Sequence, residues 1–247
     1  MTRGRLPGAA ALVCSEVTVT APTASGELTL LRGLDVTLPE RRVAVVGLNG
    51  SGKSTFLRLF NGLARPASGA VTVHGINVAR DVRTARRHVG FVFTDPLSQL
   101  VMPTPVEDVE LSLRGTGVPR ARRRAAALAL LERVGIAHRA EHSIYDLSGG
   151  ERQLAAFAAV LAVEPEVLVL DEPTTLLDLR NRGRLIDMLD GLPHQLLIST
   201  HDLGLAATAP RVLVLHEGRL VADGRPEQVL PAYERWCADG FPQEDAP

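Results

Sequence analysis

The chain has 247 residues, which is enough for one large or two small domains with a buried core. Hydrophobic residues make up 45% and charged residues 22%, a composition typical of a folded globular protein and not of a disordered one. The net charge of −1 and the aromatic content of 4% argue against a basic, base-stacking surface, so we expect no nucleic acid partner.

The N-terminal residues and the cysteines bear on where the protein resides. Cys14 and Cys237 lie near opposite ends of the chain without metal-ligand spacing, which favours a reducing cytoplasmic compartment. Pro7 and Gly8 interrupt the first apolar run, so we expect no secretory signal. No run approaches the roughly 18 apolar residues that a membrane span needs, and we expect a soluble chain.

The first predicted elements are strands. Val13, Val17 and Val19 fall at even spacing, residues 21–26 are typical of a turn, and residues 28–38 resume an extended pattern. These residues predict two or three strands of an antiparallel sheet.

A phosphate-binding loop is predicted next, in the stretch V-A-V-V-G-L-N-G-S-G-K-S-T over residues 43–55. The spacing G-x-x-x-x-G-K-[ST] is met by Gly47, Gly52, Lys53 and Ser54, between a buried strand and the start of a helix. Glycines let backbone N–H groups surround an anion, and the positive end of the following helix points at the same anion. We expect Lys53 to reach the β- and γ-phosphates of a nucleotide and the Ser54 hydroxyl to ligate Mg²⁺.

Lys53 is the only lysine in the chain, and the other basic residues are arginines. A compact ammonium fits between phosphates where a planar guanidinium would not, which favours a functional loop. The alternatives are a chance glycine turn before a helix, or a relic that binds nothing.

A mainly helical segment is predicted between residues 95 and 165. Pro119 opens and Gly135 closes one helix, and the arginine run at residues 120–124 indicates a solvated face. The alternative is contact with an acidic partner or anionic lipid. Ser148 and Glu151 form a capping box for a second helix, and Gly149 and Gly150 there suggest a second anion site, although a plain capped helix explains the same residues.

Two further buried strands end in polar residues. Residues 167–170 lead into Asp171 and Glu172, where ligands bind in open α/β sheets. Neighbouring strand residues point to opposite sides, so Asp171 can hold Mg²⁺ through water while Glu172 polarises a water. Residues 196–200 lead into His201, a candidate γ-phosphate contact. A hairpin over residues 212–222 and a short helix from Pro231 complete the predicted elements.

Taken in order, these motifs resemble an ATP-binding-cassette (ABC) ATPase over essentially the whole chain. The matching stretches are G-L-N-G-S-G-K-S at 47–54, L-S-G-G-E-R-Q at 147–153, V-L-V-L-D-E-P-T at 167–174, L-L-D at 176–178 and S-T-H-D at 199–202. The resemblance implies an α/β fold of the P-loop NTPase type, with a mostly parallel sheet, an N-terminal antiparallel β subdomain and an inserted helical subdomain. It places the core at residues 1–93 and 166–230, the helical signature subdomain at 94–165 and a tail at 231–247.

The resemblance also implies roles for individual residues. ATP and Mg²⁺ would be held by the loop residues Gly47, Asn49, Gly50, Ser51, Gly52, Lys53, Ser54 and Thr55. Glu172 would be the catalytic base and His201 the γ-phosphate sensor. The family works as a head-to-tail dimer in which Ser148, Gly149 and Gly150 of one copy close over ATP held by the other. Asp178 would lie in the loop that crosses to the second subunit.

The chain departs from the family pattern at two positions. Thr94 stands where the family usually has a glutamine that contacts Mg²⁺ and water, and Asp95 or Gln99 could substitute for it. No aromatic residue occurs between Glu16 and Leu38 to stack on adenine, the usual tyrosine position being near Ala21, which predicts loose base selectivity.

Within the family, residues 91–109 and 172–181 are similar to energy-coupling-factor importers, most of all to biotin-importer ATPases. This resemblance implies a peripheral ATPase at the cytoplasmic face of the cell membrane. Its partners would be a second ATPase subunit, identical or paralogous, an integral membrane coupling protein and a small substrate-binding membrane protein. Cobalt or nickel import and a soluble scaffold for cofactor assembly are the alternatives. A chromosome-maintenance ATPase is excluded because only about 95 residues separate Lys53 from Ser148, without heptads.

Overall fold

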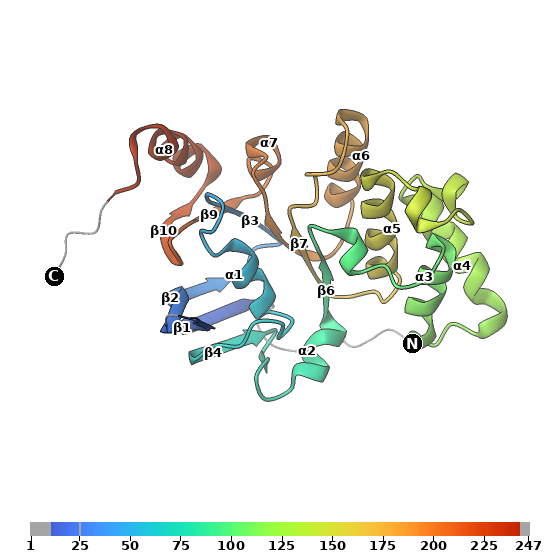
Figure 1. Ribbon diagram of the computed structural model, residues 1–247, viewed down its shortest axis with the longest axis horizontal. Coiled ribbons are helices and arrows are strands. Elements are labelled where there is room, and N and C mark those ends of the chain that lie inside the picture. Colours follow the sequence, from blue (N-terminus) through green and yellow to red (C-terminus); the bar gives the residue numbers. More distant parts are fainter. Residues whose placement is uncertain (1–10, 25, 243–247) are drawn as a thin grey trace. The chain divides into compact units, whose positions relative to one another are not determined.

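The structure is a computed structural model that describes residues 11–24 and 26–242 (Figure 1). The chain divides into two compact units. The first unit takes the chain as far as His88 and again from Leu196 onward, and the second runs from Val89 to Gln195. The interrupted apolar run around Pro7 and the last residues of the expected tail lie outside the described residues. Among the described residues, no helix is long and apolar enough to cross a membrane.

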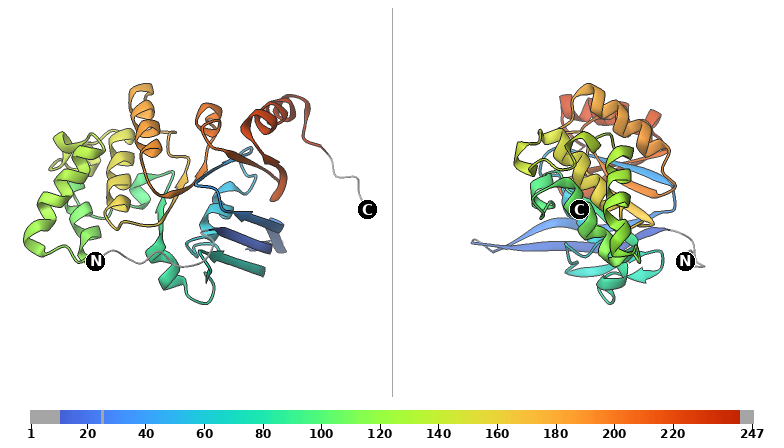
Figure 2. Two further views of the ribbon diagram at one scale, coloured as in Figure 1. Left: turned by 180° about the vertical axis from the view of Figure 1, so that it is seen from behind. Right: turned by 90° about the vertical axis from the view of Figure 1, so that its right-hand side faces the viewer.

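The first unit contains an antiparallel sheet in the order β2-β1-β4-β5. Its strands are β1 (Leu12–Thr23), β2 (Gly26–Leu38), β4 (Ser68–Val73) and β5 (Ile76–Asn77). β1 lies between β2 and β4 in both Figure 1 and Figure 2, and Leu12 faces Leu38 on one side and Val73 on the other. The prediction of an N-terminal antiparallel sheet is confirmed.

A second group of strands in the same unit is built around β3 (Arg42–Val46). β3 pairs in parallel with β8 (Gln195–Ser199) and with β9 (Arg211–His216), and β9 pairs antiparallel with β10 (Arg219–Gly224). All residues of β3 are buried, as expected for a parallel strand covered on both faces. The predicted hairpin over residues 212–222 is confirmed.

The described residues of the first unit include the helices α1 (Lys53–Leu59), α2 (Val82–His88), α7 (Leu203–Ala206) and α8 (Pro226–Asp239). α8 packs through Val229, Leu230 and Tyr233 onto a buried cluster that includes Val46 of β3 and Val214 of β9. The predicted start of this helix at Pro231 is wrong. The helix begins at Pro226, because a proline in the first turn gives up an N–H that has no partner within the helix.

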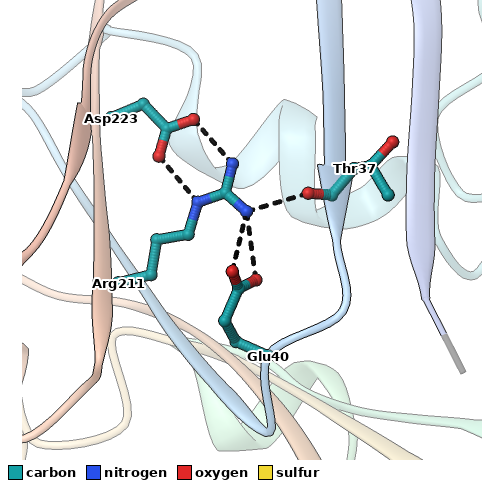
Figure 3. Close-up of polar contacts among 4 residues, drawn as sticks. All are labelled: Thr37, Glu40, Arg211 and Asp223. Carbon is teal, nitrogen blue, oxygen red and sulfur yellow. Dashed lines mark hydrogen bonds and ion pairs between the residues drawn. The ribbon is translucent and has the colours of Figure 1, made fainter.

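Arg211, at the start of β9, connects three parts of the first unit (Figure 3). Its guanidinium donates to both carboxylate oxygens of Asp223 on β10, at 2.6 and 2.7 Å, and to those of Glu40 at 3.0 and 3.1 Å. It also donates to the Thr37 carbonyl on β2 at 2.9 Å. The hydrogen bonds that Arg211 donates to Asp223 raise the pKa of the guanidinium, partial burial acts in the other direction, and the bonds to Glu40 add to the increase. This network joins the end of β2 and the start of β3 to the hairpin.

The second unit packs helices around two parallel strands. β6 (Val89–Val92) pairs with β7 (Val167–Asp171), and Gly90 faces Leu168. The helices are α3 (Pro105–Ser112), α4 (Arg120–Arg133), α5 (Gly149–Leu161) and α6 (Leu179–Asp190), with short 3₁₀ turns at 96–98, 113–115, 137–139 and 144–146. α5 passes so close to β6 that a Cβ on Gly90 would lie 2.5 Å from Val160 Cγ1.

The predicted helical character of residues 95–165 is confirmed, but two helices of the second unit were not predicted. In α3, Pro105 occupies the first turn and Thr104 caps the Glu107 N–H. α6 begins at the cap residue Asp178, which accepts from the Asn181 N–H at 2.8 Å. Both starts use side-chain caps that the sequence does contain.

Candidate active site

The glycine loop between β3 and α1 has a backbone that only glycine fits at two points. A Cβ on Gly47 would lie 2.3 Å from the Leu215 carbonyl oxygen, and one on Gly52 would lie 2.8 Å from Leu31 Cδ2. Gly50 and Gly52 have φ of 78° and 104°, in the left-handed region that other residues rarely adopt. The loop therefore presents bare backbone, which is the surface that a phosphate group needs.

Lys53 is folded back over this loop. Its Nζ donates to the Gly47 carbonyl at 2.8 Å and to the Leu48 carbonyl at 3.2 Å, and the residue is only 7% exposed. His201, which follows β8, places its Nε2 3.5 Å from the same ammonium. The first unit thus brings together two of the predicted catalytic side chains beside the loop.

The hairpin turn between β9 and β10 is hydrogen-bonded to the glycine loop. The Gly218 N–H donates to the Ser51 carbonyl at 3.0 Å, and the Gly218 carbonyl accepts from the Arg32 N–H at 2.9 Å. Gly218 has φ of 77°, and a Cβ there would lie 2.5 Å from the Leu30 carbonyl oxygen. Sequence analysis predicted this turn but missed its contact with the loop, because no local signal links residues so far apart in the chain.

The other predicted loop residues differ in exposure. Asn49 and Gly50 are exposed, Ser51 is buried, and Ser54 and Thr55 are half-buried in the first turn of α1. The Ser51 N–H donates to the Leu48 carbonyl at 3.1 Å, which closes the loop on itself.

The predicted carboxylates lie in the second unit, at the end of β7. Asp171 is 1% exposed and is the last strand residue. Glu172 has φ of 52°, a left-handed conformation that costs a non-glycine residue about 1 kcal/mol. Strain of this kind concentrates at functional positions, and nothing in the sequence signals it.

Thr94, the departure from the family pattern, is turned toward the same strand. Its Oγ1 donates to the Asp171 carbonyl at 3.2 Å. The two proposed substitutes have local roles: Asp95 accepts from the Leu97 N–H at 3.1 Å, and Gln99 accepts from the Phe93 N–H at 3.3 Å. All three side chains hold the segment that follows β6 in place.

The capping box at the start of α5 is confirmed. The Ser148 hydroxyl accepts from the Glu151 N–H at 3.2 Å, and Glu151 accepts from the Ser148 N–H at 2.8 Å. Arg139 also donates to Glu151 at 2.8 Å. Burial acts to raise the pKa of Glu151, but the bonds from Ser148 and Arg139 hold that pKa below its usual value.

The glycines of this helix start pack against the loop before α6. A Cβ on Gly150 would lie 3.2 Å from the Leu176 carbonyl oxygen, and one on Gly149 would lie 3.5 Å from Leu176 Cβ. Asp178 closes the same loop by capping α6. The second unit therefore contains the predicted residues Thr94, Ser148, Gly149, Gly150, Asp171, Glu172 and Asp178.

The donors present fit a polyphosphate better than a metal cluster. The loop offers glycine backbone and an ammonium, and no three His, Cys, Asp or Glu side chains among the described residues are grouped to hold a metal ion. A hydroxyl at Ser54 could hold a cation that is itself bound to phosphate.

Comparison with known proteins gives a consistent result. Residues 31–175 match the ABC transporter family. The chain is 41% identical over 213 residues to a Rhizobium etli protein named biotin transport ATP-binding protein BioM, covering 86% of this chain and 95% of that one. It is 40% identical over 196 residues to energy-coupling factor transporter ATP-binding protein EcfA2 of Methanospirillum hungatei, covering 76% and 49%.

Solved structures with the same fold include two that are similar over most of this chain. One is the ATP-binding cassette MJ0796 as a post-hydrolysis dimer bound to ADP and Pi, with 27% identity, a TM-score of 0.81 and coverage of 87% of this chain and 98% of that one. The other is cbiO1 of Clostridium perfringens, described as part of the ABC transporter complex cbiONQ, with 29% identity, a TM-score of 0.76 and coverage of 92% and 93%.

Proposed function

The chain belongs to the ABC transporter family and is an ATP-binding ATPase subunit, and from this premise we propose that it powers an energy-coupling-factor importer of the vitamin biotin. The observation that carries the choice of substrate is the 41% identity to the Rhizobium etli biotin transport protein, which extends over 86% of this chain. The glycine loop and its folded-back lysine supply the nucleotide chemistry that such a subunit needs.

We assign the triphosphate of ATP to the glycine loop. The loop N–H groups surround the phosphates, Lys53 moves from its carbonyl partners to the β- and γ-phosphates, and His201 contacts the γ-phosphate. The Ser54 hydroxyl and, through water, the Asp171 carboxylate would hold Mg²⁺, with Thr94 as a further oxygen. The chemistry that the cation supplies when bound is neutralisation of charge on the phosphate oxygens.

Glu172 is assigned as the general base of hydrolysis. Its carboxylate accepts a proton from the attacking water, and its left-handed backbone fixes the direction in which the side chain leaves β7. Its position directly after a buried strand supports this role, because catalytic side chains of α/β folds lie at the carboxyl ends of strands.

The second half of the site comes from another subunit, either a copy of this chain or a paralogue. Ser148, Gly149 and Gly150 of that subunit close over the γ-phosphate, and Asp178 lies in the loop between the two subunits. The dimeric state of the MJ0796 structure supports this arrangement.

We propose that the dimer works at the cytoplasmic face of the cell membrane, on an integral coupling protein that joins a small substrate-binding membrane protein. The segment from Thr94 to Leu113 is assigned to this contact, because it follows the strand beside Asp171 and exposes the apolar residues Leu97 (41%) and Val101 (69%).

The catalytic assignment is tested with Glu172→Gln. This variant keeps the shape of the side chain but cannot accept a proton, so we expect hydrolysis to fall by at least 100-fold while MgATP-dependent dimerisation persists. Phosphate release and size-exclusion chromatography measure the two properties. Hydrolysis at the wild-type rate would remove Glu172 from its role.

Transport is tested by co-expressing the chain with the membrane proteins encoded beside it. We expect uptake of labelled biotin into cells or vesicles that is lost with Glu172→Gln. Uptake of cobalt or nickel in place of biotin would contradict the substrate, and absence of the chain from membrane fractions in the presence of all subunits would favour a soluble scaffold.

A further inference from the structure

A hollow of about 240 Å³ lies in the first unit between the end of α1 and the start of α2. Its lining includes the aliphatic residues Leu59, Val71, Val78 and Val82, and the segment after α1 contributes Arg65. Among the described residues that line the hollow, Arg65 is the only charged one, and none is acidic. A ligand with an aliphatic body and a negative charge at one end fits this lining.

Backbone hydrogen bonds fix two sides of the hollow. The Val78 N–H donates to the Val71 carbonyl at 3.0 Å, and the Ala64 N–H donates to the Arg58 carbonyl at 3.0 Å. Leu59, Val71 and Val78 are also buried, so the packing of the first unit holds these side chains in place. The hollow is therefore largely preformed, and a ligand can enter it without a large cost for ordering the chain.

Arg65 is the cation that this hollow offers to a ligand. It is exposed, and within the described part of the chain it makes no hydrogen bond or ion pair. Two charged residues nearby in the sequence are, by contrast, bonded to the protein. Arg86 donates to the Asn61 carbonyl at 2.9 Å, and Asp81 accepts from the Thr84 N–H at 3.0 Å. A carboxylate on the ligand would give the Arg65 guanidinium the acceptor that the described residues do not supply.

We propose that this hollow binds a short free fatty acid, with the aliphatic chain against Val71 and Val78 and the carboxylate on the Arg65 guanidinium. At about 30 Å³ for each water-sized group, 240 Å³ holds about eight such groups, so octanoate is the probe that matches the volume. The fatty acid is a second ligand besides the nucleotide, and the inference does not rest on the proposed function.

The first test is a titration of the purified full chain with butanoate, hexanoate, octanoate and decanoate, followed by NMR of the leucine and valine methyl groups. Each buried CH₂ raises the affinity about fourfold. We expect this gain up to octanoate, a gain of less than about twofold from octanoate to decanoate, and the largest shifts at Leu59, Val71 and Val78. Absence of binding, an affinity that keeps rising about fourfold for each CH₂ beyond octanoate, or shifts confined to other residues would overturn the proposal.

Variants separate the contact with the carboxylate from the contact with the chain. Arg65→Gln should weaken octanoate about fivefold, as expected for an exposed ion pair, and leave the neutral probe octanol unchanged. Arg83→Gln removes an exposed arginine of α2 that does not line the hollow, so it is the control for net charge and should bind octanoate like the wild type. Equal octanoate affinities of Arg65→Gln and Arg83→Gln would contradict the assignment.

A third variant fills the hollow. Ala64 lines it and is half-buried, so Ala64→Leu should weaken octanoate and octanol alike, and wild-type affinity for both would count against the site. Melting temperatures show whether each variant is folded. If Ala64→Leu does not fold, the comparison of Arg65→Gln with Arg83→Gln decides.

Competition with inorganic tripolyphosphate tests whether the site is separate from the glycine loop. Lys53 is not part of the lining, so octanoate should bind with the same affinity when tripolyphosphate is saturating. Displacement of octanoate by tripolyphosphate would overturn the proposal. Binding of octanoate by a protein that binds neither tripolyphosphate nor MgATP would refute the proposed function and leave this inference standing.

Discussion

The support of the glycine loop by the distant hairpin turn can be tested with one methyl group. Gly218→Ala places a Cβ 2.5 Å from the Leu30 carbonyl oxygen, where the nearest atoms are all backbone and cannot rotate away. Gly75→Ala is a matched control, because Gly75 has a similar φ of 83° in the turn between β4 and β5 and a Cβ there would meet nothing within 4 Å.

Both substitutions strain the backbone, but only Gly218→Ala also creates a steric clash. Each forces alanine into the left-handed region, which costs about 1 kcal/mol. In Gly218→Ala the turn must also move, which stretches the bonds to Ser51 and Arg32, now 3.0 and 2.9 Å long. At about 0.5–1.5 kcal/mol for each bond, the additional destabilisation is about 1–3 kcal/mol, or a melting temperature lower by roughly 2–12 °C for a protein of this size.

The assay is thermal unfolding of both variants with and without MgATP, together with titration of tripolyphosphate. We expect Gly75→Ala to bind tripolyphosphate with wild-type affinity and Gly218→Ala to bind it about fivefold more weakly. A loss of about 1 kcal/mol in the preorganisation of the glycine loop corresponds to that ratio of affinities. Equal melting temperatures and equal affinities in the two variants would refute the support that we describe.

Three further predictions concern hydrogen bonding and backbone strain. Arg211→Met keeps the aliphatic part of the side chain but leaves the carboxylates of Asp223 and Glu40 (Figure 3) without their shared partner. Urea unfolding should show a free energy of unfolding lower by about 2–4 kcal/mol, and a decrease below about 0.5 kcal/mol would contradict the network. The bonds to Glu151 lower its pKa in the folded state, so the stability that they contribute is full above the usual pKa of about 4.5 and is lost as pH falls through the lower folded value. Urea unfolding should therefore show wild type more stable than Glu151→Gln at pH 7, by a margin that shrinks as pH falls below about 4.5, and a pH-independent margin would be a negative result. Glu172→Gly should relieve about 1 kcal/mol of backbone strain, and so raise the free energy of unfolding, while it abolishes ATP hydrolysis. Glu164→Gly, at φ of 49°, should give the same stabilisation without loss of ATP hydrolysis. Destabilisation by both changes would argue against strain at these positions.

The parts of the site that could be predicted are those whose signals are local in sequence. The capping box needs only Ser148 and Glu151, three residues apart, and the structure confirms it. The glycine loop is likewise specified by spacing within eight residues, and its backbone leaves no room for a Cβ at Gly47.

The parts that could not be predicted depend on residues far apart in the chain or on backbone angles. Arg211 binds Glu40 across 171 positions, and Gly218 supports Ser51 although the two share no pattern. The left-handed conformation of Glu172 likewise could not be predicted from the neighbouring sequence, because the same residues could end a strand without backbone strain. The start of α3 was not predicted, since a proline in a first turn and a proline in a loop look alike in sequence.

The two elements that we predict to bind anions therefore differ in what keeps them intact. The start of α5 is held by its own capping box and by Arg139, twelve residues away, so substitutions that disturb it should lie close to it in sequence. The glycine loop instead depends on Leu215 and Gly218 from the hairpin, which the chain reaches only after the whole second unit. A related sequence could keep every letter of the loop motif and still lose its geometry through a change at the hairpin turn. A match to the loop motif is for this reason not sufficient for phosphate binding, and a glycine at the hairpin turn is a second requirement that we expect.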